Sequence, residues 1–138
     1  MWFLVYVVCS GRMSDGTVFV RVLEDLEKFV GWPMFCWRHD RGMVVGILER
    51  LEWLYVRRWE QPVFFVLREE ILERLKGLLD RLWKGVDNFV RCCYDGRVCE
   101  GEYSLGEAMV EWRTRIELDY VMVQRARIGG IRVVAGGE

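Results

Sequence analysis

The sequence predicts a single domain, residues 1–138, of the α/β or α+β class: a sheet with two or three helices, extended by antiparallel strands and hairpins. In residues 1–87, short apolar segments rich in Val and Phe alternate with segments of helical period, which is typical of strands joined by helices. In residues 88–138 the apolar period shortens to that of antiparallel strands with one buried face. Hydrophobic residues make up 52% of the chain, enough for one continuous core.

Three segments of the first half are predicted strands, namely 2–9, 33–39 and 62–67. The first is too short to span a bilayer and lacks the basic residues that precede the core of a signal peptide. No other uncharged run has spanning length. We therefore expect a soluble, cytoplasmic protein without a membrane partner.

The segments 43–58 and 68–84 are predicted helices, because in each the apolar residues recur at helical spacing and form one stripe. Glu69 at the start of the second segment and Lys84 at its end suit the helix dipole. Residues 17–30 fit a helix, although "TVFVRV" within them would also make a strand. We favour the helix.

The second half contains a predicted strand at 110–122, where apolar and charged residues alternate one by one. Asp-Gly in "YDGR" (94–97) and Gly-Gly in "IGGI" (128–131) suit two-residue hairpin turns on either side of it. These features predict an antiparallel region.

The segment "GRMSDGT" (11–17) raises the question of a phosphate-binding loop, because two glycines lie between a predicted strand and a predicted helix. The segment lacks the Lys that reaches the terminal phosphates, and Asp15 would place negative charge beside them. We therefore favour the alternatives, in which Asp15 or Thr17 caps the helix or the segment closes a hairpin.

The stretches "VYVVCS", "DGTVF" and "EDLEKFV" resemble the first two strands and the following helix of the GIY-YIG nuclease family. The resemblance covers about 30 residues in the N-terminal third of the chain and is inexact. Arg21 stands where the family has the glycine of its second signature triplet, and Phe29 stands where its catalytic arginine would be. The resemblance thus implies at most a degenerate nuclease, and we do not assign the chain to the family.

The cysteines suggest one disulfide. If Asp95 and Gly96 form a hairpin turn, Cys92 lies opposite Cys99, at about the 5.5 Å Cα separation that a disulfide can span. Cys36 and His39 have the separation of a metal-ligand pair, but no second matched pair accompanies them. We predict neither a metal nor a cofactor.

A cluster of arginines is the candidate binding site. With Gly129 and Gly130 as a turn, Arg127 lies opposite Arg132 and Arg125 lies on the same face. Like charges across a sheet are unfavourable, so an anionic partner such as a nucleic-acid backbone would compensate them. A second group, at the end of the helix 43–58, consists of Arg57, Arg58 and Trp59.

The composition favours interaction over catalysis. The chain has seven Trp, and its only lysines, at 28, 76 and 84, leave 17 Arg among 20 basic residues. Trp and Arg are enriched in interface hot spots, so we predict a non-enzymatic interaction protein that self-associates as a homo-oligomer or binds another protein. Scarce Asn and Gln resemble thermophile usage. The alternative is a nucleic-acid-binding protein, against which the net charge of −1 argues. A phosphate- or nucleotide-handling enzyme or a degenerate nuclease comes third.

Overall fold

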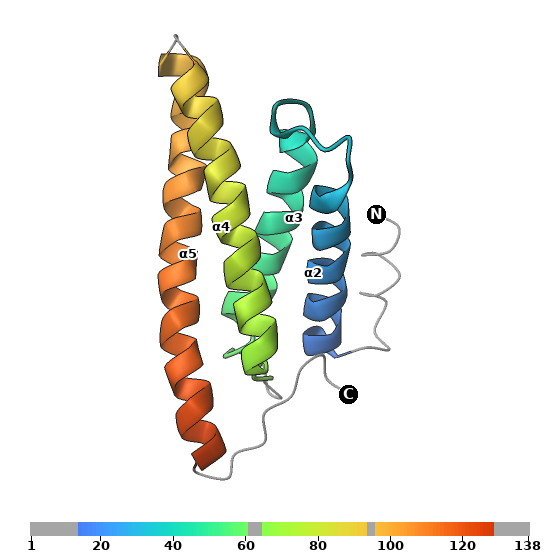
Figure 1. The fold of residues 1–138 in the computed structure, drawn as a ribbon. Coiled ribbons are helices and arrows are strands. Elements are labelled where there is room, and N and C mark those ends of the chain that lie inside the picture. Colours follow the sequence, from blue (N-terminus) through green and yellow to red (C-terminus); the bar gives the residue numbers. More distant parts are fainter. Residues whose placement is uncertain (1–13, 61–64, 94–95, 129–138) are drawn as a thin grey trace.

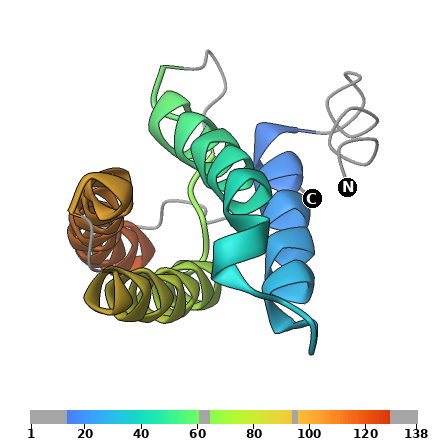
Figure 2. The same cartoon turned by 90° about the horizontal axis from the view of Figure 1, so that it is seen from above.

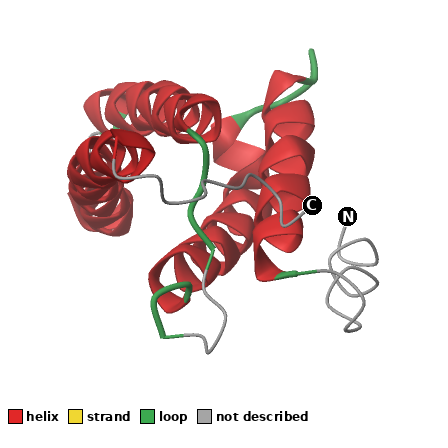
Figure 3. Ribbon diagram, turned by 90° about the horizontal axis from the view of Figure 1, so that it is seen from below, coloured by secondary structure: helices red, strands yellow, loops and turns green. Residues whose placement is uncertain are grey.

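The computed structural model describes residues 14–60, 65–93 and 96–128, and every regular element in these ranges is a helix. The helices in chain order are α2 (Asp15–Gly31), α3 (Trp37–Arg57), α4 (Glu69–Cys92) and α5 (Gly96–Ile128). Only helices and loops occur in this part of the chain (Figure 3). The predicted α/β or α+β class is therefore wrong. None of the described helices is long and apolar enough to cross a membrane.

The helices run alternately up and down, so that α3 and α5 point in the same direction (Figure 1). The helices α4 and α5 form a long antiparallel hairpin, and α2 and α3 form a second pair beside it (Figure 2). Among the described helices, the backbone of α5 comes close to that of α4 alone. Most of the surface of α5 is therefore free of the backbones of the other described helices.

The three helices predicted from apolar spacing are confirmed. The segment 17–30 lies in α2, and the segments 43–58 and 68–84 lie in α3 and α4 except for their cap residues Arg58 and Arg68; α4 continues to Cys92. Their stripes form most of the core, because each helix turns one apolar face toward the others. The largest fully buried side chains are Phe19, Leu23, Leu26, Leu51, Leu54, Tyr55, Leu67, Leu72, Leu75, Leu78, Leu79 and Ile116.

The residue that caps the start of α2 is not Asp15 or Thr17, as expected. Ser14 is the N-cap, and its Oγ accepts a hydrogen bond from the backbone N–H of Thr17 at 3.2 Å. Gly16 and Thr17 therefore lie in the first helical turn and form no glycine loop in front of it. The second strand that the nuclease resemblance implies, "DGTVF", is helical as well. Residues 11–13 lie outside the described part of the chain.

The predicted strands do not form where the structure describes them. In the segment 33–39, a turn is followed by the first residues of α3, where Trp37 is buried. In the segment 62–67, residues 65–67 have no regular structure, and Phe65 and Leu67 enter the core. Short apolar runs at helix ends look like strands because both must fill a core. The segment 2–9 lies outside the described residues.

The predicted antiparallel strand at 110–122 is wrong, because these residues lie within α5. In this part of α5, the buried apolar residues recur at helical intervals, at Met109, Trp112, Ile116 and Val123. The hairpin expected at 94–97 is replaced in part by the start of α5 at Gly96, and residues 94–95 are not described. The hairpin expected at 128–131 falls on the end of α5 at Ile128 and on residues outside the described part.

Candidate functional site

The backbones of α3 and α5 are not in contact, but two clusters of polar side chains connect these helices. The first joins Trp37 and Arg41 of α3 to Glu102 near the start of α5. The second joins Tyr55 and Arg58 at the end of α3 to Asp119 of α5. Since α3 and α5 point the same way, the clusters lie at opposite ends of the bundle.

The second cluster encloses a charge. Arg58 is 3% exposed, donates hydrogen bonds to the Tyr55 carbonyl and to Asp119 Oδ2, and forms an ion pair with that carboxylate. The Tyr55 hydroxyl donates to the same Oδ2. The Arg58 guanidinium also lies 3.6 Å from the centroid of the Tyr55 ring and 4.6 Å from that of Trp59. The buried cation is thus held by a carboxylate, a carbonyl and two aromatic faces.

Burial governs the ionisation of this cluster. Desolvation raises the pKa of Tyr55 far above its ordinary value, although the Arg58 charge acts in the opposite direction. Desolvation also lowers the pKa of Arg58, while Tyr55 and Asp119 counteract it. Tyr55 therefore stays protonated near neutral pH and serves as a hydrogen-bond donor. The Tyr55 hydroxyl and both terminal nitrogens of Arg58 are engaged within the cluster, which connects α3 to α5.

The first cluster is built in the same way around an anion. Glu102 is 3% exposed, and its Oε2 accepts a hydrogen bond from Trp37 Nε1 at 3.0 Å. Its Oε1 pairs with the Arg41 guanidinium, which reaches in from the surface. Each carboxylate oxygen therefore has a donor, as a buried charge requires.

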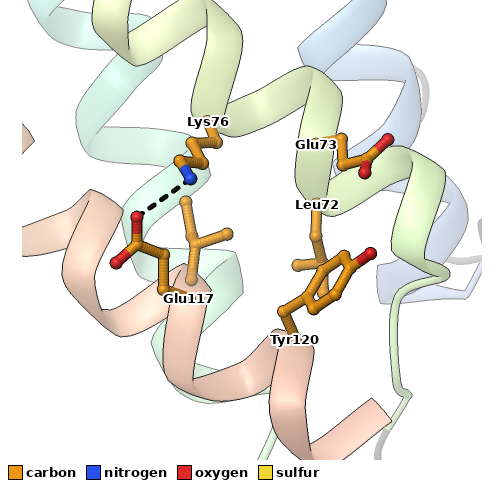
Figure 4. Close-up of a pocket in the computed structure, with 6 residues that line it drawn as sticks. Leu72, Glu73, Lys76, Glu117 and Tyr120 are labelled. Carbon is orange, nitrogen blue, oxygen red and sulfur yellow. Dashed lines mark ion pairs between the residues drawn. The ribbon is translucent and has the colours of Figure 1, made fainter. Parts of the chain in front are cut away.

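A small pocket lies between α4 and α5. Its volume is about 200 Å³, and it is lined by Leu72, Glu73, Lys76, Ile116, Glu117 and Tyr120 (Figure 4). Lys76 Nζ pairs with Glu117 Oε1 at 2.9 Å, and the Tyr120 hydroxyl donates to Glu69. Small-molecule sites usually occupy at least about 300 Å³. We assign no ligand to a hollow of this size whose cation is already paired.

No metal site is found among the described residues, where no three His, Cys, Asp or Glu side chains gather around a common point. Cys36, at the N-cap of α3, and His39, in its first turn, are both exposed. Asp40 near them accepts the backbone N–H of Cys36 at 2.9 Å, which is a contact at the start of a helix.

The disulfide joins a different pair from the predicted one. Cys99 is bonded to Cys93, with a Cα separation of 6.4 Å, and Cys92 is free and exposed. The prediction of Cys92 assumed two paired strands, whereas α4 ends at Cys92 and the next residue begins the connection to α5. The bond therefore closes the α4–α5 hairpin at its connection.

Thiol counting tests this pairing. Reduction of the unfolded protein is expected to release two thiols beyond those that react before reduction. The Cys92→Ser variant should still release two, because the bond from Cys99 to Cys93 remains, whereas Cys93→Ser should release none. The opposite behaviour of these two variants would restore the pairing with Cys92.

The structure separates the predicted arginine site. Arg58 is buried in an ion pair, so it is not available to a partner, whereas Arg57 and Trp59 are exposed. Arg125 is exposed near the end of α5, at the same end of the bundle as the end of α3 (Figure 1). Arg127 lies in α5 but its side chain is not described, and Arg132 lies outside the described residues. The sheet that was to oppose these arginines does not form at Arg125 or Arg127.

The outward side of α5 carries an apolar surface that sequence reasoning missed. Exposed large apolar side chains occur along almost the whole helix, and we call them the α5 outer face. They are Tyr103, Val110, Leu118, Val121 and Met122. Val110, Leu118 and Met122 had been assigned to the apolar face of the strand predicted at 110–122, so the position of all five residues on one side of a helix was not recognised.

The described residues thus define a helical bundle with two polar clusters, a stapled hairpin and one long, partly uncovered helix. No family model matches this chain, and neither a curated protein nor a solved structure matches it.

Sequence reasoning also missed Glu102 and Asp119, the two carboxylates of the clusters. The available signal was on α3, where Arg58 follows Leu54 and Tyr55 at intervals of four and three and so continues the buried stripe. A charged residue on an apolar stripe requires a buried counter-charge. The sequence does not say which of its 21 acidic residues supplies it.

Proposed function

We propose that this chain is a non-enzymatic interaction protein that self-associates through the α5 outer face. The observation that carries the proposal is the exposure of Leu118, 68%, together with that of Tyr103 and Val121, 51% and 49%, on one side of a single helix. Exposed large apolar side chains that gather on one side of an element are typical of interaction sites, and here Glu107 and Thr114 lie between them. The opposite side of α5 is already used by the bundle.

The charges beside the α5 outer face favour a second copy as the partner. Glu100, Glu107 and Glu111 are exposed in the first half of α5, and Arg125 is exposed near its end. A surface that is acidic at one end and basic at the other is complementary to its own copy when the two are reversed. A different protein would need its own basic group opposite the glutamates and its own acidic group opposite Arg125.

Analytical ultracentrifugation tests the proposal. The protein is expected to sediment as a dimer at concentrations on the order of 100 µM, because a single helix face gives a modest affinity. Leu118→Glu should shift it to a monomer with an unchanged helical circular-dichroism spectrum, since the side chain is exposed. Met34→Glu, at a 91% exposed position between α2 and α3, is the matched control and should leave the dimer intact.

A monomer at every concentration would contradict self-association. A Leu118→Glu dimer as stable as the unaltered one would show that copies associate through a different surface.

A second candidate, nucleic-acid binding, is favoured by the end of α3. Arg50 and Arg57 lie 4.8 and 4.3 Å from the centroid of the Trp53 ring, and Trp53 is 44% exposed. An exposed aromatic ring beside cationic side chains suits stacking on bases and contact with phosphates.

Fluorescence anisotropy of labelled single- and double-stranded oligonucleotides across a salt series tests this candidate. If it holds, binding weakens linearly with the logarithm of salt concentration, and the double variant Arg57→Ala Arg125→Ala has a smaller slope. Arg21→Ala Arg81→Ala, two exposed arginines on α2 and α4, removes the same charge elsewhere and should leave the slope unchanged. If the slope decreases equally in both double variants, the binding depends on net charge alone and not on these arginines.

A further inference from the structure

We infer that two copies of this chain pair through α5 in antiparallel orientation, with Thr114 of each copy at the twofold axis. This inference rests on the proposed self-association and specifies its geometry. It follows from the order of exposed residues along α5, from the charges at the two ends of that order, and from the absence of any other described helix backbone close to α5 except α4.

The exposed residues of α5 include a stripe whose spacing is the same in both chain directions. From Thr114, positions four, seven and eleven residues before and after it are exposed. We call these seven positions the symmetric stripe, and they are Tyr103, Glu107, Val110, Thr114, Leu118, Val121 and Arg125. Its two halves are eleven-residue repeats of about 3.67 residues per turn, so the stripe stays on one side of a nearly straight helix.

A twofold axis at Thr114 places each residue of one half opposite the corresponding residue of the other half. Val110 then lies against the partner's Leu118, and this apolar contact occurs twice. The pairing buries the centre of the α5 outer face over a stripe about 33 Å long. Because the same surface is used on both subunits, the contact closes as a dimer and does not propagate.

The ends of the symmetric stripe add polar contacts. Tyr103 lies opposite the partner's Arg125, which allows the guanidinium to stack on the ring. Glu107 is one turn from Tyr103, so the same guanidinium also comes near a carboxylate. A parallel pairing would instead place Glu107 against Glu107 and Arg125 against Arg125, so like charges disfavour it, whereas the antiparallel pairing places Glu107 opposite the partner's Val121.

The flanks of the stripe are compatible with this orientation. A twofold axis across antiparallel helices brings the same flank of each helix together. Glu111 and Arg115 share one flank of α5, so each lies near its opposite charge in the second copy. On the other flank, Glu117 is already paired with Lys76 of α4 at 2.9 Å, which offsets its charge.

Cysteine crosslinking tests the orientation in full-length chains in which Cys9, Cys36 and Cys92 are serine, leaving the Cys93 to Cys99 bond in place. A mixture of the Val110→Cys and Leu118→Cys variants should form a crosslinked dimer under mild oxidation, because opposed positions meet the distance for a disulfide. Each variant alone should crosslink at least tenfold more slowly. Ultracentrifugation of the unmixed variants before oxidation checks that they still associate.

The outcomes separate this inference from the proposed function. A dimer in which Val110→Cys crosslinks best to itself would overturn the antiparallel orientation and leave self-association standing. A dimer without any crosslink at these positions would move the interface away from the symmetric stripe. A monomeric unaltered protein would refute both.

Discussion

Replacing Asp119 with alanine is expected to lower the free energy of unfolding by about 3 kcal/mol, the largest loss that we expect from removing a single side-chain charge. Within the described residues, Asp119 is the carboxylate that pairs with Arg58, which is 3% exposed, and it also accepts the hydroxyl of Tyr55. Without it, a buried guanidinium keeps its desolvation cost and loses the attraction that offsets it. Urea unfolding followed by circular dichroism measures the change.

Two further variants show whether the buried charge is the cause. Glu117→Ala removes another paired carboxylate two residues away on α5, but that ion pair is largely exposed and its loss should change stability little. Adding Arg58→Met to Asp119→Ala removes the unpaired cation and should restore part of the lost stability. If Asp119→Ala lowers the free energy of unfolding no more than Glu117→Ala does, water must solvate the Arg58 guanidinium in place of Asp119.

The helices α2 and α4 could be predicted because their large apolar residues lie on one side, and α3 could be predicted from its buried stripe although Met43, Trp53 and Val56 are exposed. In α4 the buried positions from Ile71 to Val86 recur at intervals of three and four, and the opposite side is charged. In α5, Trp112 and Ile116 are buried while Val110 and Leu118 are exposed. Apolar residues on both sides of a helix remove the helical period, and the remaining alternation with Arg and Glu resembles a strand.

The strand at 33–39 failed for a related reason. Phe35 packs against Phe29 of α2, with 5.8 Å between ring centroids, and Trp37 reaches Glu102 of α5. The second contact joins residues 65 positions apart in the chain, and a local pattern of apolar residues does not reveal it. The same limit applies to the candidate site, since Arg58 was assigned to the surface with its neighbours Arg57 and Trp59.

At Gly106, the ring of Trp83 from α4 covers the α5 backbone. A Cβ atom at Gly106 would lie 1.5 Å from Trp83 Cζ3, far inside van der Waals contact. Gly106→Ala is therefore expected to lower the free energy of unfolding by about 2 kcal/mol, because the ring must leave its position between the helices. Urea unfolding measures this loss as well.

The sign of this effect distinguishes packing from helix propensity. Gly101 lies in the same helix with nothing within 4 Å of its Cβ position, so Gly101→Ala should stabilise the protein by up to about 1 kcal/mol. In a Trp83→Leu background the obstruction is smaller, and Gly106→Ala should cost much less there than in the unaltered chain. If Gly106→Ala is instead stabilising in the unaltered chain, Trp83 does not cover Gly106 in solution, and the two helices must lie farther apart at this position.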